Sequence, residues 1–120
     1  MEFDKDLQSI QEVRNLVAKA KAAQAEFATF SQERVDAVVK AIAQACEKEA
    51  ERLAKMAVEE TGFGIWQDKV LKNLLGSKMT YEYIKDMKTI GEISRDDAKR
   101  LRTIAVPVGV IAGLIPSTNP

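Results

Sequence analysis

The last fourteen residues of the chain, PVGVIAGLIPSTNP at 107–120, constrain its fold more than any other stretch. The run from Val108 to Ile115 is apolar on both faces, with only small residues between the branched ones. Such a run is typical of a strand that is buried on both sides in a parallel sheet covered by helices. Pro116 ends the run, because proline has no N–H to give to a strand ladder. The sequence therefore predicts a buried strand followed by a polar turn.

This turn is the first candidate for a functional site. Ligands of open α/β sheets bind just beyond the carboxyl ends of the strands. Ser117, Thr118 and Asn119 place hydroxyl and amide groups at that position. On pattern alone, the alternative is a core strand with an ordinary proline-bounded turn.

Helical patterns occupy the first half of the chain. Ser9 and Glu12 have the spacing of a capping box, which predicts a helix from Ser9 to about Thr29 after a loose lead-in. Ser31 is expected to cap a second helix, whose apolar stripe continues to about Lys48. The charged residues 47–52 are compatible with either a continuous helix or a break.

The pattern changes between residues 53 and 106. The apolar stripe resumes at 53–57 and stops at Gly62, which suits a left-handed helix cap. A further helix is expected from about Ile65 to Met87, with a slackening at Gly76. Alternating residues on either side of the polar residues 94–97 then predict two strands joined by a turn there.

Composition excludes several classes of function. Eighteen basic residues balance eighteen acidic ones, which gives no electrostatic case for a nucleic acid or an anionic membrane as partner. No apolar stretch approaches the roughly 18 residues of a membrane-spanning helix, and the polar, acidic N-terminus is not a secretory signal. The absence of histidine removes histidine-based metal sites and a histidine-assisted nucleophile, so no metal site is expected.

Four other features favour structural roles. Cys46, the one cysteine, lies on the apolar stripe and is expected to be an unreactive packing residue, in keeping with a reducing cytoplasm. Acidic residues between 47 and 60 alternate with basic ones, which predicts a solvated helix face with pairs such as Glu51–Lys55. Gly62 and Gly64 form a lone Gly-x-Gly without a preceding strand, and Trp66 has the helical spacing of a core residue.

The terminal residues also carry a family resemblance. Residues 107–111 and 114–120 resemble the first cofactor-domain strand of the aldehyde dehydrogenase superfamily. The TNP ending is similar to the CoA-acylating branch, whereas the commoner branch has aromatic residues around its asparagine. Residues 54–64 and 68–73 are similar to the N-terminal part of bifunctional aldehyde–alcohol dehydrogenases and of stand-alone acylating acetaldehyde or succinate-semialdehyde dehydrogenases. The resemblance covers about residue 10 to Pro120, which is a minor part of such an enzyme.

This resemblance implies an α/β, aldehyde dehydrogenase-like fold of which this chain is the N-terminal portion. Residues 1–90 would form a helical segment with three to four helices, 91–106 a β-hairpin and oligomerisation element, and 107–120 the first strand and site loop of a Rossmann-type NAD-binding domain. As an isolated segment it would be inactive. The competing interpretation is a non-catalytic helical scaffold or protein-interaction module.

The resemblance also implies roles for the loop residues. Ile115, Pro116, Ser117 and Thr118 would line the cofactor pocket. Asn119 would donate its amide to the oxyanion, or Thr118 would occupy that position if the loop is matched residue for residue to the commoner branch. NAD or NADP would be the cofactor and coenzyme A the co-substrate. A small aldehyde or acyl-CoA would be the substrate, the nucleophilic cysteine would lie downstream, and the enzyme would be a cytoplasmic homo-oligomer.

Overall fold

A computed structural model describes residues 4–118. Within them, the chain divides into two compact units, one of residues 4–30 and 90–112 and the other of residues 31–89 and 113–118. The predicted boundaries at residues 90 and 106 rest on a different criterion, the family's functional segments, and stay a prediction.

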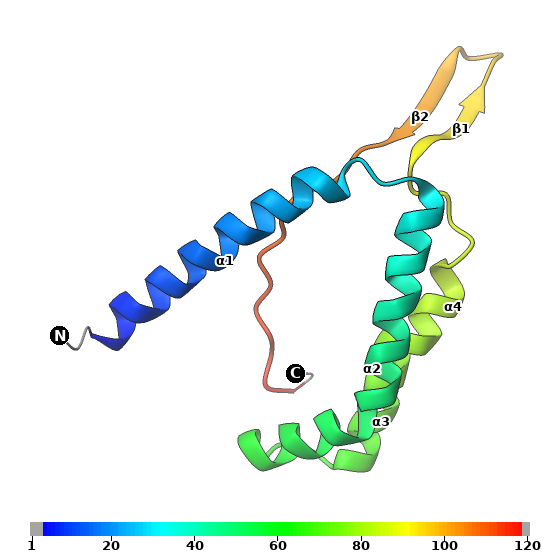
Figure 1. Ribbon diagram of the computed structural model, residues 1–120. Helices are drawn as coiled ribbons and strands as arrows, with labels where there is room; N and C mark the ends of the chain where they lie inside the picture. The colour runs from blue at the N-terminus through cyan, green and yellow to red at the C-terminus, as the bar shows by residue number, and fades with distance from the viewer. Residues whose placement is uncertain (1–3, 119–120) are drawn as a thin grey trace. The chain divides into compact units, whose positions relative to one another are not determined.

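The first unit contains helix α1, Lys5–Phe27, and a β-hairpin (Figure 1). The capping box predicted at Ser9 is wrong. The helix begins directly after Asp4, and the Ser9 hydroxyl donates to the carbonyl oxygen of Lys5 at 2.9 Å, so Ser9 lies inside the helix. A serine inside a helix commonly bonds back to the preceding turn, and this bond competes with the capping geometry. The helix ends two residues before Thr29, close to the expected position.

The hairpin pairs β1, Gly91–Asp96, with β2, Leu101–Ala105, in antiparallel register. The turn predicted at residues 94–97 lies later, at residues 97–100, since Ser94 pairs with Thr103 inside the ladder. The carboxylate of Asp96 accepts the backbone N–H of Lys99 at 3.0 Å, and this bond closes the turn. A bulge between Glu92 and Ser94 shifts the register.

The second unit is built on helix α2, Gln32–Thr61. Its predicted start is confirmed, because the Ser31 hydroxyl accepts the backbone N–H of Arg34 at 3.4 Å. Its predicted end is confirmed too, since Gly62 caps it in the left-handed conformation with φ +70°. The helix continues through residues 47–52 without a break.

Helices α3, Trp66–Leu74, η1, Leu75–Met79, and α4, Thr80–Ile84, form the rest of this unit and all contact α2. The slackening predicted at Gly76 is confirmed: η1 is a π-helical turn, in which the Thr80 hydroxyl donates to the carbonyl of Leu75 at 2.7 Å. The helical region ends at Ile84, earlier than expected.

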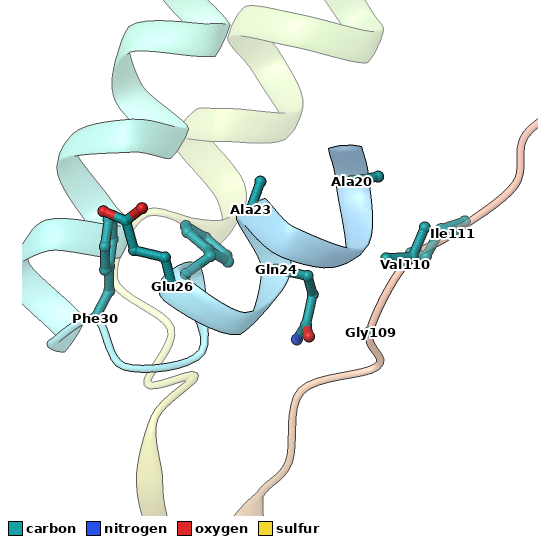
Figure 2. Close-up of a pocket in the computed structure, with 9 residues that line it drawn as sticks. Ala20, Ala23, Gln24, Glu26, Phe30, Gly109, Val110 and Ile111 are labelled. Atoms are coloured by element: carbon teal, nitrogen blue, oxygen red, sulfur yellow. The ribbon is translucent and has the colours of Figure 1, made fainter. Parts of the chain in front are cut away.

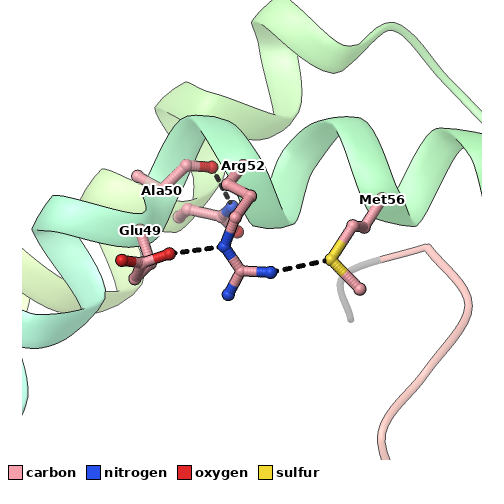
Figure 3. Close-up of polar contacts among 5 residues, drawn as sticks. Glu49, Ala50, Arg52 and Met56 are labelled. Atoms are coloured by element: carbon pink, nitrogen blue, oxygen red, sulfur yellow. Dashed lines mark hydrogen bonds and ion pairs between the residues drawn. The ribbon is translucent and has the colours of Figure 1, made fainter.

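The buried face of α2 consists of alanines. Four of them are less than 9% exposed and recur at intervals of seven, four and three residues along one side of the helix: Ala43, Ala50, Ala54 and Ala57. Small side chains allow two helix backbones to approach closely. At this contact the Asn73 side chain of α3 donates to the carbonyl of Ala50 at 2.9 Å, next to the exposed pair Glu49–Arg52 (Figure 3). An amide that bonds to the backbone of a neighbouring helix fixes the register of the two helices.

The segment after β2 differs from its predicted form. Residues 106–116 are not assigned to a strand, and the run predicted to be buried is exposed, with Val108 at 86% and Leu114 at 100%. In residues 4–118 the sheet has two strands, β1 and β2, which pair with each other and leave this run without a neighbouring strand. A strand is buried only when neighbouring strands and covering helices are present. None of the helices within the described residues is both long and apolar enough to cross a membrane.

Candidate functional site

The loop predicted to be the site is exposed. Pro116, Ser117 and Thr118 are all classed as exposed, and Ile115 retains 81% of its accessible surface. Asn119, the predicted oxyanion donor, lies outside the described residues. The roles of the other loop residues are untested and stay predictions. What the structure adds is the contact that holds this loop.

Lys69 makes that contact from helix α3. Its ammonium Nζ donates to the carbonyl oxygen of Thr118 at 2.8 Å, although the lysine is only 4% exposed. A buried ammonium costs free energy unless it is paired or hydrogen-bonded. A hydrogen bond from a charged donor is shorter and stronger than one between neutral groups. The second unit therefore has a strong contact between α3 and the loop.

The turn before α3 makes room for the Lys69 side chain. Gly64 has φ +77°, and a Cβ added there would lie 3.3 Å from Cε of Lys69. Thr61 braces this turn, because its hydroxyl donates to the carbonyl of Ala57 at 2.6 Å and accepts the N–H of Phe63 at 3.2 Å. The Gly-x-Gly sequence thus has a structural function, which is to shape the path of a buried lysine.

The loop also presents side-chain hydroxyl groups. The carbonyl of Thr118 accepts from Lys69, and Thr118 is exposed. The Ser117 hydroxyl makes no hydrogen bond within residues 4–118 and is exposed. Two neighbouring hydroxyls beside backbone carbonyls are donors and acceptors of the kind that bind a ribose.

Cys46 is exposed, which corrects its predicted burial. It lies on the wall of a groove of about 790 Å³ between α2 and the helices that pack on it, together with Lys72, Asn73 and Ser77. The buried face of α2 is occupied by alanines, and Cys46 falls to one side of it.

Trp66, expected in the core, is half-buried, and the ammonium of Lys55 lies 4.6 Å from its ring centroid.

The acidic residues of α2 form the solvated face that the sequence predicts. Glu51 pairs with Lys55 at 2.5 Å, and Glu49 pairs with Arg52 at 2.5 Å. The hydrogen bond from Arg52 lowers the pKa of the Glu49 carboxyl below its ordinary value. Residues 4–118 contain no group of three histidine, cysteine, aspartate or glutamate side chains that could hold a metal ion.

An apolar groove of about 530 Å³ lies in the first unit. The C-terminal part of α1 forms one wall, with Ala20, Ala23 and Phe27, and residues 109–111 form the other (Figure 2). The ring centroids of Phe27 and Phe30 are 5.3 Å apart at its end. No titratable pair capable of acid–base chemistry lines this groove, so the loop near Lys69 remains the best candidate for chemistry.

Comparison with known proteins decides the family. The sequence profile of the aldehyde dehydrogenase family matches residues 6–120. This chain belongs to that family. The resemblance seen in residues 54–64 and 107–120 is thereby confirmed, as is the aldehyde dehydrogenase-like fold class.

The relatives of this aldehyde dehydrogenase chain include acylating enzymes. It is 46% identical over 112 residues to the bifunctional aldehyde-alcohol dehydrogenase AdhE of Escherichia coli, covering 93% of this chain and 13% of AdhE. It is 44% identical over 108 residues to the succinate-semialdehyde dehydrogenase (acetylating) of Clostridium kluyveri, covering 90% and 24%. The chain therefore spans about a quarter or less of these relatives.

Solved structures give the same relationship. The crystal structure of an acetylating aldehyde dehydrogenase from Geobacillus thermoglucosidasius is 55% identical, with a TM-score of 0.94 over 99% of this chain and 26% of that one. A probable aldehyde dehydrogenase from Listeria monocytogenes is 63% identical, with a TM-score of 0.92 over 98% of this chain and 26% of that one. Agreement at this level shows that the chain shares the fold of these enzymes over the matched residues.

Sequence reasoning missed Lys69 as a site residue. It lies in the stretch 68–73 that carries part of the family resemblance, but nothing in the helical pattern marks it as buried. The one available signal is the pair of glycines just before it, because a glycine has no Cβ and lets another side chain lie close to the backbone.

Proposed function

We propose that this chain is a segment of a CoA-acylating, NAD-dependent aldehyde dehydrogenase. The observation that carries the proposal is its 44–46% identity to relatives whose names include an acetylating enzyme, together with 55% identity to a solved acetylating aldehyde dehydrogenase. In the proposed reaction a cysteine thiolate attacks an aldehyde, and the thioester that follows oxidation is passed to coenzyme A. Bound NAD or NADP would accept the hydride. The reverse direction reduces an acyl-CoA to the aldehyde.

The loop residues have two proposed roles. Residues 115–118 line the cofactor pocket, with the Ser117 hydroxyl and the nearby backbone facing the ribose. Asn119 donates its side-chain amide to the oxygen that becomes negative when the thiolate attacks, and Thr118 is the alternative donor. A fixed donor aimed at the developing charge lowers a barrier by about 3–4 kcal/mol. The exposure of Ser117 and Thr118 supports the proposal, since both can reach a ligand.

The attacking cysteine is proposed to lie outside these 120 residues. Cys46 is exposed, but no histidine occurs in the chain to act as its base. Cys46 also belongs to α2, whereas Lys69, which contacts the loop, belongs to α3. The isolated chain is therefore expected to be catalytically silent.

The proposal also covers the oligomeric state, the location in the cell and the substrates of the complete enzyme. The hairpin β1–β2 is proposed to act as an oligomerisation element, which would give a homo-oligomer. Both strands are largely exposed in this chain, so their edges are available for pairing. A cytoplasmic location suits a chain with a single free cysteine. The partners of the complete enzyme would be a small aldehyde or acyl-CoA.

A coenzyme A dependence assay tests this proposal. The product of the complete reading frame, incubated with acetaldehyde and NAD, is expected to form NADH only when coenzyme A is present and to release acetyl-CoA. The 120-residue chain serves as the negative control. NADH formation with release of free acetate, independent of coenzyme A, would contradict the acylating assignment. A product without any aldehyde-dependent turnover would favour the helical scaffold module.

A further inference from the structure

Lys69 combines three properties that surface lysines of this chain do not share. It is 4% exposed, its ammonium lies 2.8 Å from the Thr118 carbonyl oxygen, and a glycine at position 64 leaves space for its side chain. By contrast, Lys72, one turn later on the same helix, is exposed. The Lys69 bond joins residues 49 positions apart in the chain.

Stability alone does not explain this arrangement. A methionine of similar length would fill the same space without the cost of desolvating a charge, and replacing buried charges by apolar groups is often neutral or stabilising. The ammonium is therefore better explained by what it holds than by what it packs against. What it holds is the backbone of the candidate site loop.

The bond acts on the peptide group that links residues 118 and 119. The atoms of a peptide group lie close to one plane, so fixing the carbonyl oxygen of Thr118 fixes the orientation of the unit that leads into the next residue. The proposed oxyanion donors are the side chains on either side of this peptide group. An error of about 1 Å in the position of a catalytic group can cost a hundredfold in rate.

We propose that Lys69 is a positioning residue of the site: its ammonium fixes the Thr118 carbonyl and thereby aims the loop that carries the oxyanion donor. The inference rests on the proposed function for its catalytic consequence. Its mechanical consequence rests on the structure alone: the loop loses its fixed orientation when the Lys69 ammonium is removed.

The first test compares Lys69→Met with Lys72→Met in the complete enzyme. Lys69→Met is expected to lower the single-turnover rate of thioester formation by about 10- to 100-fold, with a melting temperature close to that of the wild type. Lys72→Met should stay within twofold in rate. A Lys69→Met enzyme with a wild-type rate overturns the proposal, and so does one whose lost rate is accounted for entirely by lost folded protein.

A double-mutant cycle tests whether Lys69 acts through the loop. When the donor has already been removed by Asn119→Ala, adding Lys69→Met should cost less than about threefold, because residues that act through one another are not additive. The same cycle on Thr118→Val applies if Thr118 proves to be the donor. A loss that is as large in the donor-less background as in the wild type would show that Lys69 acts independently, and would contradict the proposal.

A third measurement separates this inference from the function itself. In crystal structures of the complete enzyme, the Thr118 carbonyl should keep its orientation in Lys72→Met and lose it in Lys69→Met, since the charge-assisted bond to that carbonyl is lost. If the wild type shows no coenzyme A-dependent turnover, the proposed function fails, and a displaced loop in Lys69→Met still supports Lys69 as the residue that holds the loop. The same loop conformation in the two variants overturns the positioning role whatever the activity.

Discussion

Asn119 and Thr118 are adjacent in sequence, and the proposed site needs one of them as the oxyanion donor. With Asn119 in that role, Asn119→Ala in the complete enzyme should lower kcat by about 10²–10³, the usual effect of losing one oxyanion donor. NAD affinity should barely change, because the proposed cofactor contacts come from residues 115–118 and not from the Asn119 side chain. Single-turnover kinetics of thioester formation, with a melting temperature measured alongside, provides the check.

Thr118→Val is the matched control for this assignment. Valine keeps the shape of threonine and removes the hydroxyl, while the backbone carbonyl that Lys69 binds is retained. If Thr118 is the donor, the valine variant loses the rate and the alanine variant stays nearly normal. Near wild-type turnover of both variants, with intact folds, would show that the loop is only a structural turn.

The sequence identified the residues that cap helix α2 at its two ends, but it did not identify the residue that holds the loop. Ser31 and Gly62 were predictable because a cap depends on a few neighbouring residues. The capping box predicted at Ser9 was wrong because the spacing between Ser9 and Glu12 also occurs inside a helix. Lys69 escaped because its partner, Thr118, is 49 residues away, and burial of a lysine depends on that distant contact.

The alanine face of α2 determines how closely the helices of the second unit pack. Ala54 is 1% exposed, so Ala54→Leu inserts three carbons where there is no space and should destabilise the chain by about 1–3 kcal/mol. Ala41→Leu, on the exposed side of the same helix, should change stability by less than about 0.5 kcal/mol. Thermal unfolding followed by circular dichroism at one fixed concentration measures both.

A small effect of Ala54→Leu would contradict the close packing of α2 on α3. A large effect of both variants would instead point to a change in helix propensity or association, because Ala41 is exposed. The alanine spacing itself could be read from the sequence only as part of a wide apolar stripe. Larger residues of that stripe, such as Ile42 at 58% exposure, lie outside the buried face.

Helices and strands could be predicted where the pattern of residues is local. The segments that each of them packs against or pairs with could not. The helices, the slackening at Gly76 and the strand pair follow from residues close in sequence. The hairpin turn was misplaced by a few residues because Asp96 closes a later turn through Lys99. The run 108–115 has the composition of a buried strand, but burial requires neighbouring strands, and within residues 4–118 no strand pairs with it.

Many large apolar side chains within residues 4–118 are exposed. Five branched apolar side chains of α1 are 47–57% exposed, and those of residues 106–115 are 43–100% exposed. Exposed apolar patches promote association. The isolated 120-residue chain is therefore expected to self-associate in a concentration-dependent manner and to bind dyes that detect exposed apolar surface. Sedimentation velocity over a dilution series measures this, and a monomer that is stable at all concentrations without dye binding would contradict it.

A cysteine other than Cys46 is proposed to carry out the thioester chemistry that this chain serves. Intact-mass and peptide-mapping spectrometry of the complete enzyme, quenched after mixing with acetyl-CoA in the absence of NADH, identifies that cysteine. We expect one acetyl adduct on a cysteine outside residues 1–120, unchanged in amount by Cys46→Ser and absent from the isolated chain. An adduct on Cys46, or turnover that Cys46→Ser abolishes, would contradict the proposed function.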